Sequence, residues 1–418
     1  MAHKLSGKEH RRIERWAKKG ELNHLFSFFA DQRQTLNVDK PLLIGSQGEE
    51  DVFVQGFVPI RKILQKFHYL DSTYNRNTTF RRVYGTQKRS DEERSRLAPS
   101  IEGAIHRHFI TSFPRLCFLE KVTPCSGRII HAHAIQEAQL RVYAKDGKVY
   151  FPNPRAERSE GLTDFKLLGV NRATTFTGFC TGHDNSIFRP IETVPFIGNP
   201  EQVFLYHYRA LCKDYYVRLV SKSFFKKMIT EFERLNLADQ VNYIRNLDAM
   251  NELDLSEINM GKPWLDESIK TQSYGALSGC WMRGSGVPGV LATTNLFPPR
   301  DLLGRPIPNR KSSRLENWIS LTITIESGLP LVLIAGPKTS ALLQQLLESI
   351  RDTPQVQLSA ALCRFALAYS EHFVIIPKWW EGLEKGARRA ARLTFNSRYY
   401  SDYFKGPFDW TFEKPVFF

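Results

Sequence analysis

The sequence predicts an α+β protein, and two stretches of its C-terminal half carry that prediction. From residue 200 onward, apolar residues recur at spacings of three and four, which predicts a long helix; they are Phe204, Leu205, Tyr208, Leu211, Tyr215 and Leu219. Farther along, residues 318–326 alternate as a strand does, and residues 329–335 form an apolar run that ends at Gly336. Strand pairs that are followed by helices are typical of the α+β class.

The same patterns predict the other elements of this half. We expect helices over residues 200–219, 224–235, 238–253, 341–350, 358–369 and 379–395, and strands over residues 276–281, 289–295 and 374–377. The 418 residues then divide into three parts. These are a basic N-terminal region over 1–114, a cysteine- and histidine-bearing module over 115–199, and a larger helical plus mixed-sheet domain over 200–418.

The chain carries a strong positive charge, which bears on its partners. The formal net charge is +15, and residues 1–116 hold 21 Lys+Arg against 13 Asp+Glu. Ser6 and Glu9 have the spacing of a capping box, so we expect a helix to about Gly20 with a basic face. An excess of this kind attracts polyanions, so DNA or RNA is the expected partner; the alternative is a solvated basic surface.

Other classes of protein are disfavoured by composition. No apolar run approaches the length of a membrane span, and the basic N-terminus lacks the apolar core of a secretory signal, so no membrane association is expected. Six scattered cysteines do not form a disulfide framework, which predicts a reducing, cytoplasmic setting. The sequence also has no Walker loop and no His-Glu-x-x-His motif. A protein partner and a homo-oligomer both stay open.

A cluster of cysteine and histidine residues predicts a structural zinc site. Cys180 and His183 have two residues between them, which allows one tight turn to direct both side chains at one ion. Cys117 and Cys125 lie upstream, separated by seven residues, too many for a single zinc knuckle. The remaining ligands are therefore expected from Cys117, Cys125 or the histidines that follow, and which of the two cysteines binds stays open.

Residues 129–136 and 176–192 carry a resemblance to a known family. The first is an apolar strand that ends in His131-Ala132-His133 and continues with Ala-Ile-Gln, and the second contains the Cys-x-x-His step. This combination resembles HNH-type ββα-metal nucleases, which are often braced by a treble-clef zinc finger. The second stretch is also similar to a phrase found in large bacterial proteins of uncharacterised function.

The resemblance implies a fold, a site and a reaction. The fold would be α+β, with an HNH-like, zinc-stapled ββα module between the basic N-terminal segment and the C-terminal region. His133 takes the position of the family's catalytic base, His131 that of a second-metal ligand, and Asp184 or Asn185 follows the knuckle where a further ligand is expected. A catalytic Mg²⁺ or Mn²⁺ and endonucleolytic hydrolysis of phosphodiester bonds, in bacterial host defence, would follow.

A second hypothesis is a catalytically inactive, zinc-stapled scaffold or partner-binding protein. Residues 173–178 contain no Asn, whereas the family usually has one a few residues before the second knuckle, and this favours the scaffold.

Four further polar residues have no role in either hypothesis. Arg209 and Asp214 are left over when core packing is assigned to the helix beginning at 200, and they could face a site. The pair Glu371-His372 precedes an apolar strand and is either an acid–base pair or a structural pair.

Overall fold

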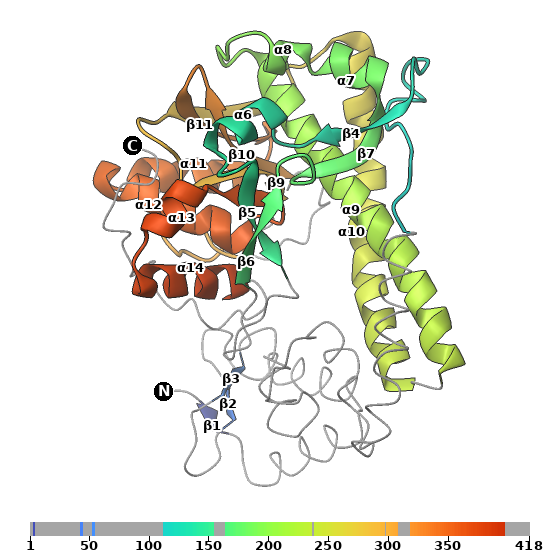
Figure 1. Ribbon diagram of the computed structural model, residues 1–418, viewed down its shortest axis with the longest axis vertical. Helices are drawn as coiled ribbons and strands as arrows, with labels where there is room; N and C mark the ends of the chain where they lie inside the picture. The colour runs from blue at the N-terminus through green and yellow to red at the C-terminus, as the bar shows by residue number, and fades with distance from the viewer. Residues whose placement is uncertain are drawn as a thin grey trace.

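The structure is a computed structural model that describes residues 3–4, 42–44, 52–54, 112–153, 164–235, 238–296, 298–307 and 318–397. Its class is α+β, as the sequence predicts (Figure 1). A small sheet joins β1 (His3–Lys4), β2 (Leu42–Ile44) and β3 (Val52–Val54). The basic helix expected over residues 6–20 lies outside the described residues. In the part of the chain that the structure describes, no helix combines the length and apolar composition needed to cross a membrane.

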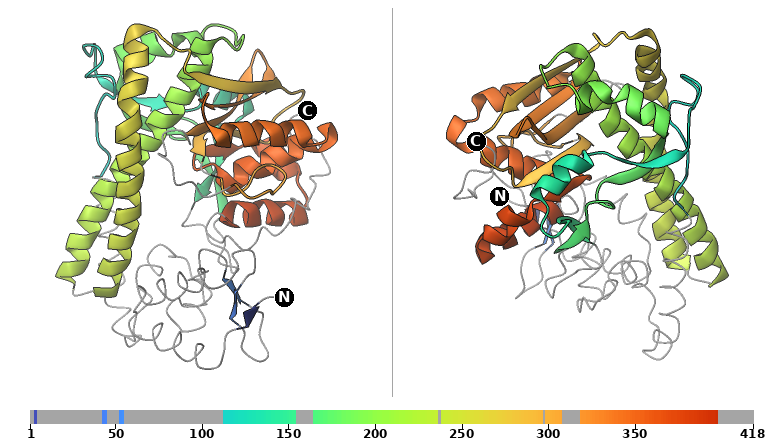
Figure 2. Two further views of the ribbon diagram at one scale, coloured as in Figure 1. Left: turned by 180° about the vertical axis from the view of Figure 1, so that it is seen from behind. Right: turned by 45° about the horizontal axis from the view of Figure 1, so that its top comes forward.

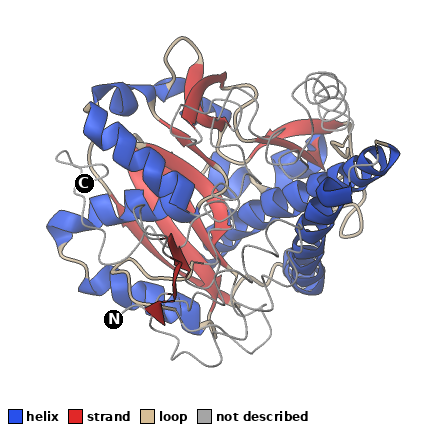
Figure 3. Ribbon diagram, turned by 90° about the horizontal axis from the view of Figure 1, so that it is seen from below, coloured by secondary structure: helices blue, strands red, loops and turns tan. Residues whose placement is uncertain are grey.

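A seven-stranded antiparallel sheet organises the molecule, in the order β6-β5-β12-β9-β10-β11-β8. Its strands are β5 (Lys148–Asn153), β6 (Asp164–Gly169), β8 (Leu277–Arg283), β9 (Val290–Leu296), β10 (Ile319–Glu326), β11 (Leu329–Pro337) and β12 (Phe373–Ile375). The predicted strands of the C-terminal half are confirmed as β8 to β12. Figure 3 shows the strands crossing the middle of the molecule between helices.

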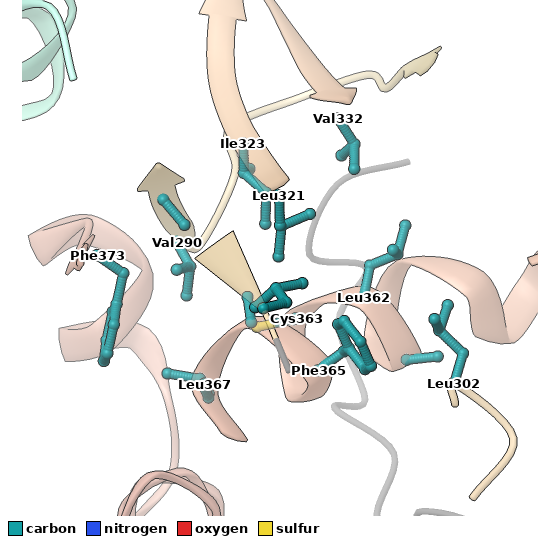
Figure 4. Close-up of a cluster of buried hydrophobic side chains, with 14 of the residues drawn as sticks. Val290, Leu302, Leu321, Ile323, Val332, Leu362, Cys363, Phe365, Leu367 and Phe373 are labelled. Atoms are coloured by element: carbon teal, nitrogen blue, oxygen red, sulfur yellow. The ribbon is translucent and has the colours of Figure 1, made fainter. Parts of the chain in front are cut away.

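One face of this sheet is covered by the C-terminal helices (Figure 2). They are α11 (Ala341–Asp352), α12 (Gln355–Tyr369), α13 (Pro377–Gly382) and α14 (Lys385–Ser397). The core between them is apolar, and Figure 4 shows Leu321 and Ile323 of β10 facing Leu362 and Phe365 of α12. The single helix expected over 379–395 is wrong, because α13 ends at Gly382 and α14 begins only at Lys385.

The opposite face packs against a long helical hairpin, α9 (Pro200–Arg234) and α10 (Ala238–Thr271), which extends beyond the sheet (Figure 1). The sequence predicted a break in α9 near residue 220, and this is wrong: residues 220–223 contain no Gly or Pro to end a helix. Helix α10 likewise continues past the predicted end at 253, through Pro263.

A smaller two-stranded sheet lies beside α9 and is built from the middle of the chain. Strand β4 (Ile129–His133) pairs antiparallel with β7 (Thr175–Cys180), and α7 (Thr181–Ile187) and α8 (Arg189–Glu192) follow directly. Between β4 and β7 the chain forms α6 (Glu137–Tyr143) and then leaves to supply β5 and β6 to the large sheet. The segment 115–199 therefore contributes strands to both sheets.

Strand β10 of the large sheet is polar on the face that is turned to α9. Ser320, Thr322 and Thr324 alternate with the apolar residues of β10, so they point away from α11 and α12. All three are buried, and the Oγ of Ser320 lies 3.0 Å from Nδ1 of His207 on α9. Burial lowers the pKa of His207 to about 4, because the charged imidazole would lose its hydration.

This histidine should make the stability depend on pH. The unfolded chain binds a proton at His207 below about pH 6.5, whereas the folded protein does not until about pH 4. The free energy of unfolding should therefore decrease as the pH falls from 6.5 towards 4, with a contribution of about 2 kcal/mol between pH 7 and pH 5. Urea unfolding of wild type and His207→Asn at both pH values measures this. Equal losses in the two proteins would contradict it.

Candidate metal centre

Four potential metal ligands converge beside the two-stranded sheet of β4 and β7. Cys117, Cys125, Cys180 and His183 each offer one donor atom, and these atoms all lie within 4.8 Å of one another. Cys117, Cys180 and His183 are buried, whereas Cys125 is exposed. The sequence predicted these four residues as candidate ligands, and the fold brings Cys117 and His183 together although they are 66 residues apart.

The start of α7 places two of the donors. Cys180 is the last residue of β7 and has an extended backbone, so it serves as the N-cap of α7. Its Sγ accepts a hydrogen bond from the N–H of His183 at 3.5 Å, within the first helical turn. The two-residue spacing thus directs both side chains to the same point, as the sequence predicted.

Backbone hydrogen bonds hold the loop of the other two donors against this turn. The N–H of Phe118 donates to Gly178 O at 3.0 Å, and the N–H of Gly182 donates to Ser126 O at 2.9 Å. A Cβ on Gly182 would lie 2.8 Å from that same Ser126 oxygen and closer still to its Oγ. Glycine is needed at position 182 because the loop approaches so closely.

A threonine that the sequence analysis missed orients the histidine. Thr123 Oγ1 lies 2.6 Å from Nε2 of His183, while Nδ1 of the same ring lies 3.1 Å from Sγ of Cys117. The ring therefore presents Nδ1 to the sulfur atoms, and Nε2 has its own partner. Partners of this kind fix the tautomer and ring orientation of metal-binding histidines. The only signal in the sequence is a hydroxyl residue two positions before Cys125.

The thiols differ in how readily they ionise. Burial raises the pKa of Cys180, but hydrogen bonds from the backbone of His183 and Ser126 outweigh it and leave the pKa below its ordinary value. Burial raises the pKa of Cys117. Desolvation and the neighbouring Cys117 thiol raise the pKa of Cys125 to about 12. A bound metal ion would supply the positive charge that allows these neighbouring thiols to ionise together.

The donor set fits a tetrahedral ion such as zinc. Three sulfur atoms and one imidazole nitrogen form a closed structural set for Zn²⁺. Both Cys117 and Cys125 lie in this cluster, so the geometry allows both of them to bind the same ion. His131 and His133 do not belong to this cluster.

His133 and Asp184 lie in a second polar group on the same unit. Nε2 of His133 donates to Val170 O at 3.1 Å in the tautomer that this contact favours, and its Nδ1 lies 3.9 Å from Glu137 Oε2. Burial raises the pKa of Asp184, and the charges of Arg209 and His133 oppose that rise. Arg209 approaches Asp184 to 4.0 Å and also contacts Glu192. His131 is exposed at a register shift between β4 and β7.

Comparisons with protein-family models, with curated proteins and with solved structures found no match for this chain. The site must therefore be interpreted from its own geometry.

Replacing one cluster cysteine should release the metal, while replacing another cysteine should not. Cys180→Ser should lose stoichiometric zinc and be strongly destabilised, because structural zinc contributes directly to folding. Cys280→Ser is the matched control, since Cys280 is partly buried on β8 and outside the cluster. Elemental analysis and thermal unfolding of the purified proteins measure both effects. Zinc that persists at one equivalent in Cys180→Ser would remove Cys180 from the site.

Proposed function

We propose that this chain is a zinc-stapled, nucleic-acid-interacting protein whose β4, β7 and α7 form an HNH-like ββα module with metal-dependent endonuclease activity. The observation that carries the proposal is the placement of His133 and Asp184. They lie at the end of β4 and within α7, and α7 directly follows β7, the strand that pairs with β4. The Cys-x-x-His cluster anchors the start of the same helix.

His133 has the geometry of a general base. Because its Nε2 donates to the carbonyl of Val170, Nδ1 keeps the lone pair that accepts a proton from water. Glu137, 3.9 Å from Nδ1, would stabilise the imidazolium that forms. Imidazole is suited to this role because it ionises near neutral pH.

Asp184 supplies the position for a divalent cation. Its Oδ1 is buried and has no hydrogen-bond partner among the described residues. A bound Mg²⁺ or Mn²⁺ would supply positive charge that stabilises the negative charge on the phosphate whose bond is cleaved. The exposed His131, on the same strand as His133, would be the second ligand.

The charge of the chain supports DNA or RNA as the partner. With a net charge of +15, binding of a polyanion should be dominated by phosphate contacts and weaken as salt is added. A cytoplasmic location belongs to the same proposal and rests on the six scattered cysteines, whereas a role in bacterial host defence rests on the resemblance alone.

A specific contact favours the alternative of an inactive scaffold. Arg209, buried on α9, approaches Asp184 and stacks over the Phe188 ring at 4.1 Å. A guanidinium there already balances the carboxylate and would repel a metal ion. On this reading the zinc cluster serves only to hold β4, β7 and α7 against α9 for a partner to bind.

A cleavage assay separates the two hypotheses. With Mg²⁺ or Mn²⁺ the wild type should cleave plasmid DNA or RNA, and His133→Ala should be slower by about 100-fold or more, because a general base contributes that much. His131→Ala should keep the maximal rate but need more metal. Each variant should retain its zinc and its binding to nucleic acid at low salt.

Two outcomes would contradict the nuclease proposal. Equal cleavage by wild type and His133→Ala would exclude His133 as the base. Nucleic-acid binding without cleavage by the wild type, with either ion, would support the scaffold instead.

A further inference from the structure

A second group of buried polar residues lies at the centre of the large sheet, away from the zinc cluster. The register places His372 next to the start of β12, beside Thr293 of β9, which in turn pairs with Thr322 of β10. Residues directly opposite each other share a face, and this row faces α9 together with Leu333 of β11. On this face of the sheet, β11 is apolar, whereas the residues of β9 and β10 that lie near Asp214 of α9 are polar.

The short length of β12 leaves room for Asp214. Strand β12 begins at Phe373, opposite Ala292, so among the described residues no strand pairs with β9 on this side beyond Thr293. The N–H of Asn295 donates instead to Oδ2 of Asp214, at 3.0 Å. The carboxylate is therefore fixed by the sheet, and its other oxygen, Oδ1, is turned toward His372.

The contact between Asp214 and His372 has the spacing of two ligands of one ion. Oδ1 and Nε2 are 2.9 Å apart, yet their directions do not make a hydrogen bond, and neither atom has a hydrogen-bond partner among the described residues. Two donors that bind one ion at about 2.1 Å and at right angles lie about 3.0 Å apart. Glu371 adds a third donor, and the three atoms lie within 4.8 Å of one another.

Two more buried oxygen atoms lack a partner on the same face. Asn295 is 7% exposed and Thr322 is 1% exposed, and neither Oδ1 nor Oγ1 finds a hydrogen bond in the part of the chain that the structure describes. Alternation along β9 and β10 directs both side chains towards α9. Buried polar atoms are normally satisfied, so several unsatisfied ones in one place point to a bound group.

We propose that Asp214, Glu371 and His372, with the side-chain oxygen of Asn295, form a second site that binds a divalent cation. The donors are oxygen atoms and one imidazole nitrogen, a set that suits Mn²⁺ or Zn²⁺ and differs from the sulfur-rich cluster. Fewer than six protein donors leave open positions on an ion that prefers six, and these positions can take water or a substrate oxygen.

Arg218 holds the outer ligand in place. Its Nη2 donates to both oxygens of Glu371, at 2.9 and 3.0 Å, and its Nε lies 3.4 Å from Asp254. Ligating carboxylates are commonly oriented by such partners. The side chain of Glu371 is 42% exposed, which gives a cation a route from solvent to the buried Asp214 and His372.

Titration with Mn²⁺ tests this site, because Mn²⁺ does not favour the thiolate cluster. Protein loaded with zinc at the cysteine site is titrated with Mn²⁺, and the loss of the free-ion paramagnetic resonance signal counts the bound ions. The wild type should bind one Mn²⁺ more than His372→Ala. Glu371→Gln should weaken that site about tenfold or more.

Matched variants separate this site from other carboxylates. Glu252→Gln is the control for Glu371→Gln, since Glu252 is also paired with a cation, Lys222, and is 44% exposed. It should leave Mn²⁺ binding unchanged. Asp184→Asn should leave the site intact too, which distinguishes it from the ion of the proposed nuclease.

The proposal would be overturned if wild type and His372→Ala bound the same number of Mn²⁺ ions with the same affinity. It would also be overturned if neither Mn²⁺ nor Zn²⁺ bound beyond the zinc of the cysteine cluster; ordered water would then fill the group. Circular dichroism shows whether each variant is folded. Should His372→Ala fail to fold, Glu371→Gln decides the question, because its side chain is partly exposed and glutamine can still accept a hydrogen bond from Arg218.

Discussion

The first half of α9 constrains the rest of the molecule, because every residue from 202 to 214 is buried and the helix therefore has no solvent-facing side there. Its polar side chains must each find a partner in the surrounding elements. The contacts are Gln202 to the carbonyls of Pro190 and Pro195, His207 to Ser320, Arg209 to Glu192, Lys213 to the carbonyl of Thr175, and Asp214 to the N–H of Asn295. Helix α9 thereby joins the two-stranded sheet of β4 and β7, which carries the Cys-His cluster, to the large sheet.

This arrangement explains why the polar groups of interest border one helix. Arg209 reaches Asp184 beside the two-stranded sheet of β4 and β7, and Asp214, more than one helical turn later, reaches His372 next to β12 of the large sheet. Because these residues are buried, loss of any one contact should be costly: an unpaired charge in such a place costs several kcal/mol. Lys213 shows the same effect, because burial lowers its pKa to about 8 and the charge of Asp214 opposes the shift.

The sequence predicted what depends on local pattern and missed what depends on distant contacts. The periodicity of apolar residues was enough to locate β10, β11 and most of α9. The two-residue spacing between Cys180 and His183 was enough to single out these two as candidate ligands. The joint use of Cys117 and Cys125 depends on a loop whose path is set by hydrogen bonds to β7 and α7. Asp214 and the pair Glu371-His372 were each noted as unexplained, but no local pattern links residues 158 positions apart. The pairing of β5 with β12 could not be predicted either, because these strands are far apart in the sequence.

We expect three sulfur atoms and one nitrogen atom to bind a single zinc ion and fix β4, β7 and α7. X-ray absorption at the zinc edge of the purified protein tests it directly. The account predicts a first shell of three sulfur atoms at about 2.3 Å and one nitrogen atom at about 2.0 Å. A zinc shell of oxygen and nitrogen atoms without sulfur, or a folded protein purified with zinc available that contains none, would contradict it.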